Sequence, residues 1–256
     1  KNSRDLNINR IKIFKMKHYW INIDKCIERR EFMENQFAKE GIENFRVSAF
    51  TPSDFPKYLN HEGPITCKYP GCTTCDYEFA CLMSHIKAMQ AGLESGEDYF
   101  IILEDDIYLP FILDYENIIK DMPCETEILQ MLILYGPTVK SLYNIYKNKG
   151  HMFLKWQYLL PSAGMYMISR EGAKKIVNLF YNNGKYSFMK SPYQIVADVL
   201  LYETVTTYAT MCPYAYPYSI LGSTIHPDHI TAHEKAIKDI KDVLKEDLPY
   251  IKKRCP

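Results

Sequence analysis

The sequence predicts an α/β fold in which helices flank a largely parallel sheet. Segments rich in aromatic and β-branched residues alternate with segments whose apolar residues recur at helical spacing, which is typical of strand–helix–strand units. Two later segments, 100–103 and 127–136, are almost wholly apolar, as expected of central strands covered on both faces. At 256 residues the chain can bury a substantial core.

The first three predicted elements follow one another directly. Residues 18–24, HYWINID, form the first strand, and residues 45–50, FRVSAF, form the second. Between them, residues 26–41 carry apolar side chains at helical spacing, and Gly41 is placed to cap the helix C-terminus.

Residues 51–76 interrupt this rhythm with repeated prolines and glycines, so we interpret them as a functional loop or an insertion. A helix is predicted over 76–93, with Asp76 as its N-cap. After the strand at 100–103, a further helical stretch is predicted over 110–122.

The second half of the chain continues the alternation. A short strand at 164–169 leads into a helix that Ser169 caps and Gly184 ends. The tail opens with a capping-box pattern, Thr231 to Glu234, followed by an apolar stripe. We expect one domain over 1–256, with a lead-in at 1–17, a Pro/Gly/Cys-rich insertion at 51–76 and a C-terminal helix at 231–256.

The composition argues against two classes of partner. Thirty-one basic residues balance thirty-one acidic ones, so no long-range field draws the chain to nucleic acid or to an anionic membrane. No apolar run reaches 18 residues, so we expect no membrane span in this chain. A soluble protein is expected, with the cytoplasm favoured, and the oligomeric state stays open.

Three acids, Glu104, Asp105 and Asp106, stand where the apolar strand at 100–103 should end. Ligand sites in open α/β sheets lie beyond the carboxyl ends of the strands. In an extended backbone Glu104 and Asp106 point one way and Asp105 points the other. Two such carboxylates make half a site for Mg²⁺ or Mn²⁺. The alternative is a helix N-terminus, where acids offset the macrodipole without any ligand.

Four motifs follow one another along the chain: INIDKCIERREFM (21–33), a helix motif of Glu78, Cys81, Ser84 and His85, ILEDD (102–106) and GMYMISREGAKKI (164–176). With these motifs in this order, the chain resembles glycosyltransferase family 25, the lipopolysaccharide and collagen sugar transferases. The resemblance covers residues 19 to about 176, and the chain departs from the family pattern in the cysteine-rich insertion and at Phe79 and Ala80.

This resemblance implies a GT-A-like nucleotide-diphospho-sugar transferase fold with a mixed, mostly parallel sheet. It implies transfer of a hexose, galactose or glucose, from a UDP-sugar to a hydroxyl of a glycan or glycoprotein acceptor, with inversion. Mn²⁺ or Mg²⁺ held by Glu104 and Asp106, a DxD-like motif, would bridge the donor phosphates, and Asp105 would bind the ribose or the donor sugar. The rival classes are an inactive carbohydrate-binding or scaffold protein of this fold and a metal-dependent phosphohydrolase.

The remaining polar candidates follow from the same resemblance. His226 is the expected further metal ligand, ahead of His229 and His233, and a surface loop histidine is the alternative. Asp198 is the expected base that takes the proton of the acceptor hydroxyl, and a helix cap is the alternative. Asp228 is the second choice for that base.

Two basic residues and one amide come from the first strand and helix. Arg29 is expected to approach the donor phosphates or the uracil, because arginine pairs bidentately with phosphate. Asn22 is expected to help bind the nucleotide base, and Arg30 to lie on a solvated helix face. For Ser84 and His85 we expect helix packing, with the histidine satisfied internally.

Two further groups stay open. Four of the eight cysteines, Cys67, Cys72, Cys75 and Cys81, crowd together. A structural zinc site with His61 or Cys81, disulfides and free thiols all fit this spacing. The segment PYAYPYSI (213–220) suits either the stacking of an acceptor or plain packing.

Overall fold

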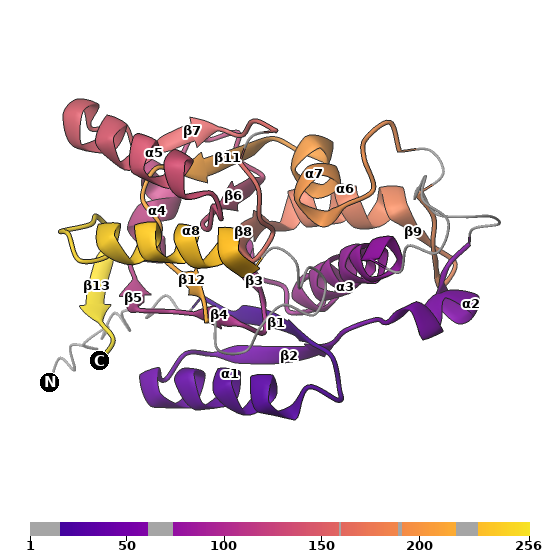
Figure 1. The fold of residues 1–256 in the computed structure, drawn as a ribbon. Coiled ribbons are helices and arrows are strands. Elements are labelled where there is room, and N and C mark those ends of the chain that lie inside the picture. Colours follow the sequence, from indigo (N-terminus) through magenta and orange to yellow (C-terminus); the bar gives the residue numbers. More distant parts are fainter. Residues whose placement is uncertain (1–15, 61–73, 159, 189–190, 219–229) are drawn as a thin grey trace, which may run out of the picture.

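A computed structural model describes residues 16–60, 74–158, 160–188, 191–218 and 230–256. Its centre is a seven-stranded sheet (Figure 1). In spatial order the strands are β2 (Asn44–Ser48), β1 (His18–Asn22), β3 (Tyr99–Glu104), β8 (Met165–Ser169), β6 (Ile128–Gln130), β11 (Thr207–Thr210) and β7 (Phe153–Lys155).

The sheet is mixed. Strands β2, β1, β3, β6 and β11 run in one direction, whereas β8 and β7 run against them. The predicted α/β class with a mostly parallel sheet is therefore confirmed. Because β8 is antiparallel between β3 and β6, the loop that enters it lies at the edge where those two strands end. This edge carries the candidate site.

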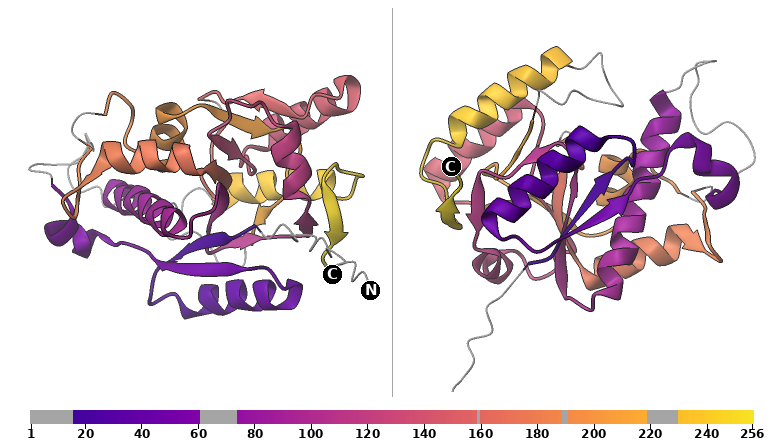
Figure 2. Two further views of the ribbon diagram at one scale, coloured as in Figure 1. Left: turned by 180° about the vertical axis from the view of Figure 1, so that it is seen from behind. Right: turned by 90° about the horizontal axis from the view of Figure 1, so that it is seen from below.

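Helices cover both faces of the sheet. Figure 2 shows α3 and α6 together on one side and α5 and α8 together on the other, in agreement with the contacts within each pair. The helices of the described chain are α1 (Ile27–Glu40), η1 (Pro52–Asp54), α2 (Phe55–Tyr58), α3 (Thr74–Glu94), α4 (Tyr115–Asp121), α5 (Gly136–Lys149), α6 (Arg170–Phe180), α7 (Ala197–Thr204) and α8 (Ile230–Val243).

The core forms one cluster of buried apolar side chains from the sheet and from helices on both of its faces. Helix α3 packs especially close to β3, since a Cβ added at Gly92 would overlap the ring of Phe100. This contact fixes one face of α3 against the strand that ends in the acidic residues.

The structure bears out two predicted caps. Gly41 ends α1 with a left-handed φ of 64°, and its N–H donates to the backbone carbonyls of Ala38 and Phe37. The hydroxyl of Ser169 accepts from the backbone N–H of Gly172 at the start of α6.

Two other predicted caps were wrong. Helix α3 begins at Thr74, so Asp76 lies inside its first turn. Helix α6 ends at Phe180, and Gly184 instead serves a hairpin between β9 (Tyr181–Asn182) and β10 (Lys185–Tyr186). Asn183 and Gly184 both have positive φ there, as a tight hairpin turn requires.

Two segments predicted as helix, 110–122 and 231–256, each contain a strand. Residues 110–122 contain β5 (Phe111–Leu113) before α4, and β5 pairs with β13 (Ile251–Arg254). The predicted C-terminal helix therefore ends at Val243 and does not continue to residue 256. Pairing with a segment more than 130 residues away decided both outcomes, and no local pattern could reveal it.

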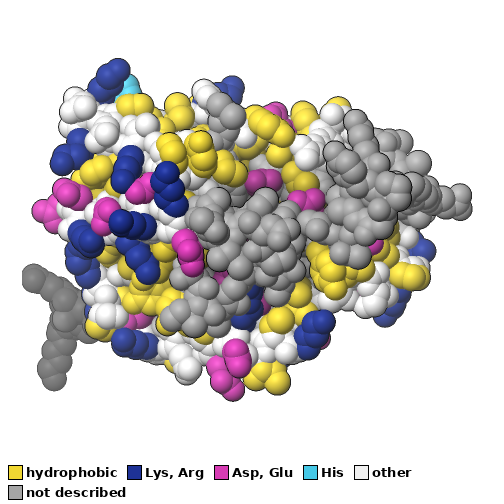
Figure 3. All heavy atoms as spheres, in the orientation of Figure 1, with side chains coloured by type: hydrophobic (Ala, Val, Ile, Leu, Met, Phe, Trp, Pro, Cys, Tyr) yellow, Lys and Arg dark blue, Asp and Glu magenta, His cyan; other side chains and the backbone are white. Residues whose placement is uncertain are grey.

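Lysines gather on the face of the molecule formed by α5 and α8 (Figure 3). Several are ion-paired, among them Lys140 with Asp239 and Lys147 with Glu246. In the described part of the chain, no helix combines the length and the apolar character that crossing a membrane requires.

Candidate functional site

The acidic residues lie where parallel strands end side by side. Residues Ile21 of β1 and Glu104 of β3 are register partners, so Asn22 and the turn at Asp105 and Asp106 meet at one edge of the sheet. Strand β3 ends at Glu104, and the chain turns at the next two residues. The strict alternation expected of an extended backbone therefore stops at Glu104.

Asp105 is buried and held by two neighbours from the first strand–helix unit. Its Oδ1 accepts a hydrogen bond from Nη1 of Arg29 at 2.6 Å, and its Oδ2 accepts from Nδ2 of Asn22 at 2.7 Å. Burial raises the pKa of Asp105, and the charge of Arg29 opposes that shift. The three side chains thus form an internal ion-pair network. Asp105 and Asp106 both lie against Arg29, whereas the sequence predicted that Asp105 points away from Glu104 and Asp106.

Asp106 is the acid with the strongest perturbation. Its Oδ2 lies 3.6 Å from Nη2 of Arg29, so one guanidinium serves both aspartates. Burial, followed by the charge of Glu104, raises the pKa of Asp106 to about 7. Among the described residues, one guanidinium faces three carboxylates at this turn, and these residues leave it short of positive charge.

Glu104 also contacts side chains of α3. Its Oε1 lies 3.5 Å from Nε2 of His85 and 4.0 Å from Sγ of Cys81. Burial and the charge of Glu104 raise the pKa of the Cys81 thiol well above its ordinary value, and Asp198 adds to the shift. The ligand atoms of Cys81, His85 and Glu104 all lie within 4.8 Å of one another.

The expectation of an internally satisfied histidine is only half correct. Nδ1 of His85 is hydrogen-bonded to the hydroxyl of Tyr166 at 3.1 Å, but Nε2 is buried without a hydrogen-bond partner among the described residues. Ser84 does pack as expected, since its hydroxyl accepts from the N–H of Phe50 and donates to the carbonyl of Ala80.

Asp198 reaches the same edge from α7. Its Oδ2 accepts a hydrogen bond from the backbone N–H of Ser162 at 3.1 Å. Two residues further along this loop, the carbonyl of Gly164 accepts from the N–H of Glu104 at 3.0 Å. The loop that enters β8 therefore connects Asp198 with the acidic strand end.

This loop is held in a strained conformation. Ser162 has a φ of 111°, a value that side chains disfavour. Its carbonyl accepts from Tyr202 at 3.0 Å and from Gln130 at 2.9 Å, so buried polar groups fix it in place. Such strain persists where surrounding contacts over-determine the backbone, and it is common at functional sites.

The aromatic segment after β11 also contacts the acidic turn. Residues Tyr216–Pro217 form β12, which pairs with β4 (Ile107–Tyr108) directly after the acids. The N–H of Tyr218 donates to the carbonyl of Asp106 at 2.6 Å, and the ring of Tyr218 stacks on Phe32. Both the packing and the ligand-stacking interpretations of this segment remain.

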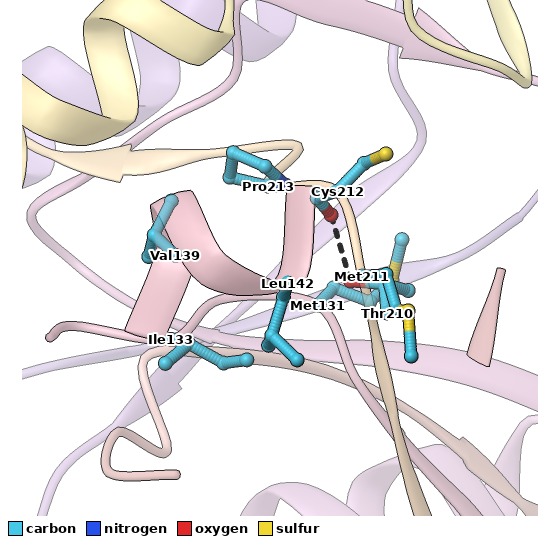
Figure 4. A pocket seen from close by; sticks show the side chains of 8 residues that line it. All are labelled: Met131, Ile133, Val139, Leu142, Thr210, Met211, Cys212 and Pro213. Carbon is cyan, nitrogen blue, oxygen red and sulfur yellow. Dashed lines mark hydrogen bonds between the residues drawn. The ribbon is translucent and has the colours of Figure 1, made fainter. Parts of the chain in front are cut away.

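A small cavity elsewhere on the sheet offers no comparable chemistry (Figure 4). Its volume is about 10 Å³, which is room for one water at most, and its side chains are uncharged. The lining residues are Met131, Ile133, Val139, Leu142, Thr210, Met211, Cys212 and Pro213.

The carboxylate site fits a hard divalent cation. Carboxylate oxygens are preferred ligands of Mn²⁺ and Mg²⁺, and the deficit of positive charge around Asp106 favours a bound cation. The predicted ligand His226, its alternative His229 and the second-choice base Asp228 lie outside the described residues, as do Cys67 and Cys72. Among the described cysteines, Cys81 is a free thiol.

Sequence reasoning missed the pairing of Cys81 and His85 with Glu104. The two α3 residues are four positions apart, a spacing that places side chains on one helix face. That spacing was the available signal. Arg30 was predicted on a solvated face, and its Nη2 donates to the carbonyl of Asp24 near the surface.

Two sequence comparisons identify relatives. The family model described as "Glycosyltransferase family 25 (LPS biosynthesis protein)" matches residues 15–191. A protein of Haemophilus influenzae named "Putative glycosyltransferase" is 26% identical over 192 residues, which is 73% of this chain and 62% of that protein. The chain thus spans about three fifths of the length of this curated relative.

Solved structures give weaker likenesses. A glycosyltransferase involved in the glycosylation of the major capsid of PBCV-1 aligns with a TM-score of 0.33 and 11% identity, over 66% of this chain and 68% of that one. Mouse xyloside xylosyltransferase 1 aligns with a TM-score of 0.34 and 9% identity, over 74% and 66%. The GT-A-like fold assignment therefore depends on the family match and on the mixed, mostly parallel sheet.

Proposed function

Because the chain belongs to glycosyltransferase family 25, we propose that it transfers a hexose, galactose or glucose, from a UDP-sugar to a hydroxyl group. The acceptor is a glycan or a glycoprotein, and the configuration at the sugar carbon is inverted. The observation that carries this proposal is the position of Asp106, which is partly buried in the turn after β3, beside Glu104, with its pKa raised to about 7. A cation and a diphosphate would complete this charge arrangement.

Glu104 and Asp106 hold the divalent cation in this proposal, with His226 as a further ligand. When bound, Mn²⁺ or Mg²⁺ supplies Lewis-acid stabilisation of the negative charge on the departing UDP. Arg29 and Asn22 anchor Asp105 and thereby fix the turn that carries Asp106. In this proposal Arg29, Asn22 and Asp105 line one side of the donor site.

Asp198 is the proposed base. Its carboxylate is oriented by the N–H of Ser162, and the second carboxylate oxygen is the atom that would take the proton of the acceptor hydroxyl. The strained loop at 161–164 contacts both acids: the N–H of Ser162 donates to Asp198, and the carbonyl of Gly164 accepts from the N–H of Glu104.

The test is a panel of UDP-sugars incubated with a glycan acceptor and Mn²⁺ or EDTA, with release of UDP as the measurement. We expect turnover with one or two donors, lost with the chelator. Asp106→Asn should lower the rate about a thousandfold or more, because charge stabilisation by such a cation amounts to several kcal/mol.

Asp98→Asn is the matched control, because Asp98 is a largely exposed aspartate just before the same strand. It should retain the wild-type rate. Turnover that resists EDTA would remove the cation from the mechanism. Silence across the whole panel would favour an inactive carbohydrate-binding or scaffold protein.

A further inference from the structure

We propose that Cys81, His85 and Glu104 form a second cation site, selective for a thiophilic ion of the zinc type. The site lies between the face of α3 that packs on the sheet and the end of β3. Its donor atoms are a thiol sulfur, an imidazole nitrogen and a carboxylate oxygen, all within 4.8 Å of one another. The proposal goes beyond the sugar-donor site, whose ligands are carboxylates.

The separations suit tetrahedral coordination. Zinc bonds of about 2.0–2.3 Å at tetrahedral angles place neighbouring ligand atoms roughly 3.3–3.6 Å apart. Nε2 of His85 already lies 3.5 Å from Oε1 of Glu104. Sγ of Cys81 lies 4.0 Å from the same oxygen, and all three ligand atoms lie within 4.8 Å of one another, so small side-chain rotations would bring the set to these separations.

His85 supplies an independent observation. Its side chain is fully buried, and Nε2 has no hydrogen-bond partner among the described residues. A buried nitrogen left in this way costs free energy unless a ligand satisfies it. The other ring nitrogen is hydrogen-bonded to the hydroxyl of Tyr166, which is the outer contact that orients a metal-binding histidine.

The donor set selects the ion. Thiolate and imidazole ligands favour zinc, whereas Mn²⁺ and Mg²⁺ prefer sites made of oxygen atoms. Three protein ligands leave a fourth position for water. Cys81 and Glu104 are both partly exposed, so an ion can enter from solvent.

Glu104 belongs to both the Cys81–His85–Glu104 site and the proposed donor cation site, so the two sites compete for it. This coupling rests on the proposed function. An ion bound to Cys81 and His85 draws the Glu104 carboxylate toward α3 and away from the cation that serves the donor. Excess zinc should therefore inhibit sugar transfer. Binding itself is measured without any turnover, so failure of one claim is distinguishable from failure of the other.

The test is a titration of the full chain with Co²⁺, which replaces zinc and gives a thiolate-to-cobalt charge-transfer absorption. We expect a band that saturates at one ion and disappears when Zn²⁺ is added. Cys81→Ser and His85→Gln should both abolish it. Tyr166→Phe should weaken binding about tenfold to a hundredfold, because it removes the outer contact of the histidine.

Three controls make the result specific. Asp106→Asn should keep the band, because Asp106 belongs to the carboxylate site. Cys124→Ser, at an exposed thiol, should keep it as well. A variant carrying Cys72→Ser and Cys75→Ser tests whether the cysteines of the insertion bind the ion instead.

Two results would count against the Cys81–His85–Glu104 site. A band that survives His85→Gln but is lost with Cys72→Ser and Cys75→Ser would overturn the proposal, as would the absence of any band in the wild-type chain. If Cys81→Ser fails to fold by circular dichroism, His85→Gln and Tyr166→Phe still decide between these outcomes.

Discussion

The acidic turn, residues 104–106, has different neighbours on its two sides, which we call its flanks. On one flank, Arg29 and Asn22 hold the buried carboxylate of Asp105 with hydrogen bonds of 2.6 and 2.7 Å. On the other flank, Oε1 of Glu104 lies 3.5 Å from Nε2 of His85 and 4.0 Å from Sγ of Cys81. A permanent positive charge makes the first flank structural. The second flank brings three potential metal-ligand atoms within 4.8 Å of one another.

Asp106 lies between these flanks and shares features of both. It has Arg29 within 3.6 Å, yet burial and Glu104 still raise its pKa to about 7. One guanidinium is therefore insufficient for the turn, which is why a cation is expected there. Changes on each flank should have different consequences.

The largest expected effect is on the Arg29 flank. Arg29→Met should lower the free energy of unfolding by about 3–5 kcal/mol, because it leaves the buried carboxylate of Asp105 and the partly buried one of Asp106 without their cationic partner. Chemical denaturation measures the loss. Arg30→Met is the matched control from the next helix position and should cost about 1 kcal/mol or less. Equal losses in the two variants would contradict the structural assignment of this flank.

The pH dependence of stability tests Asp106. In the metal-free protein the folded state holds a proton up to about pH 7 that the unfolded chain releases near its ordinary pKa of 3.8. Stability should therefore fall as pH rises between these values, by up to about 4 kcal/mol. Thermal melts of wild type and Asp106→Asn across this range measure it. The variant should lack the fall, and Mn²⁺ should offset it in the wild type.

A substitution at Asp198 tests the proposed catalytic base. Asp198→Asn keeps an oxygen that can accept from the N–H of Ser162, so the loop should stay in place. Loss of the base should still lower the turnover of a UDP-sugar about a hundredfold or more. An unchanged rate with an unchanged melting temperature would show that Asp198 is not the base.

The smallest expected effect is on the Cys81 flank. Without added metal, Cys81→Ala should cost about 1 kcal/mol or less, because a thiol contact at 4.0 Å stabilises little. With Zn²⁺ present, the wild type should gain stability that the variant lacks. Thermal melts with and without Zn²⁺ measure both quantities. A large loss without metal would make this flank structural too.

Much of the fold follows from local pattern. The strands at 18–22 and 165–169, the helix over 27–40 and the caps at Gly41 and Ser169 formed where the sequence predicted them, because periodicity and capping act over a few residues. Strand β5 and the end of α8 were mispredicted, because β13 is distant in sequence and pairs only in the folded chain.

By itself the sequence determined that acids follow a buried strand, that helices alternate with strands, and that the family motifs occur in order. Only the tertiary structure decided what each acid faces. The register of β1 with β3 brings Asn22 and Arg29 to Asp105, and the packing of α3 on β3 brings Cys81 and His85 to Glu104. The reason is physical: the charge state and ligand capacity of a carboxylate depend on neighbours within a few ångströms, and those neighbours come from remote parts of the chain.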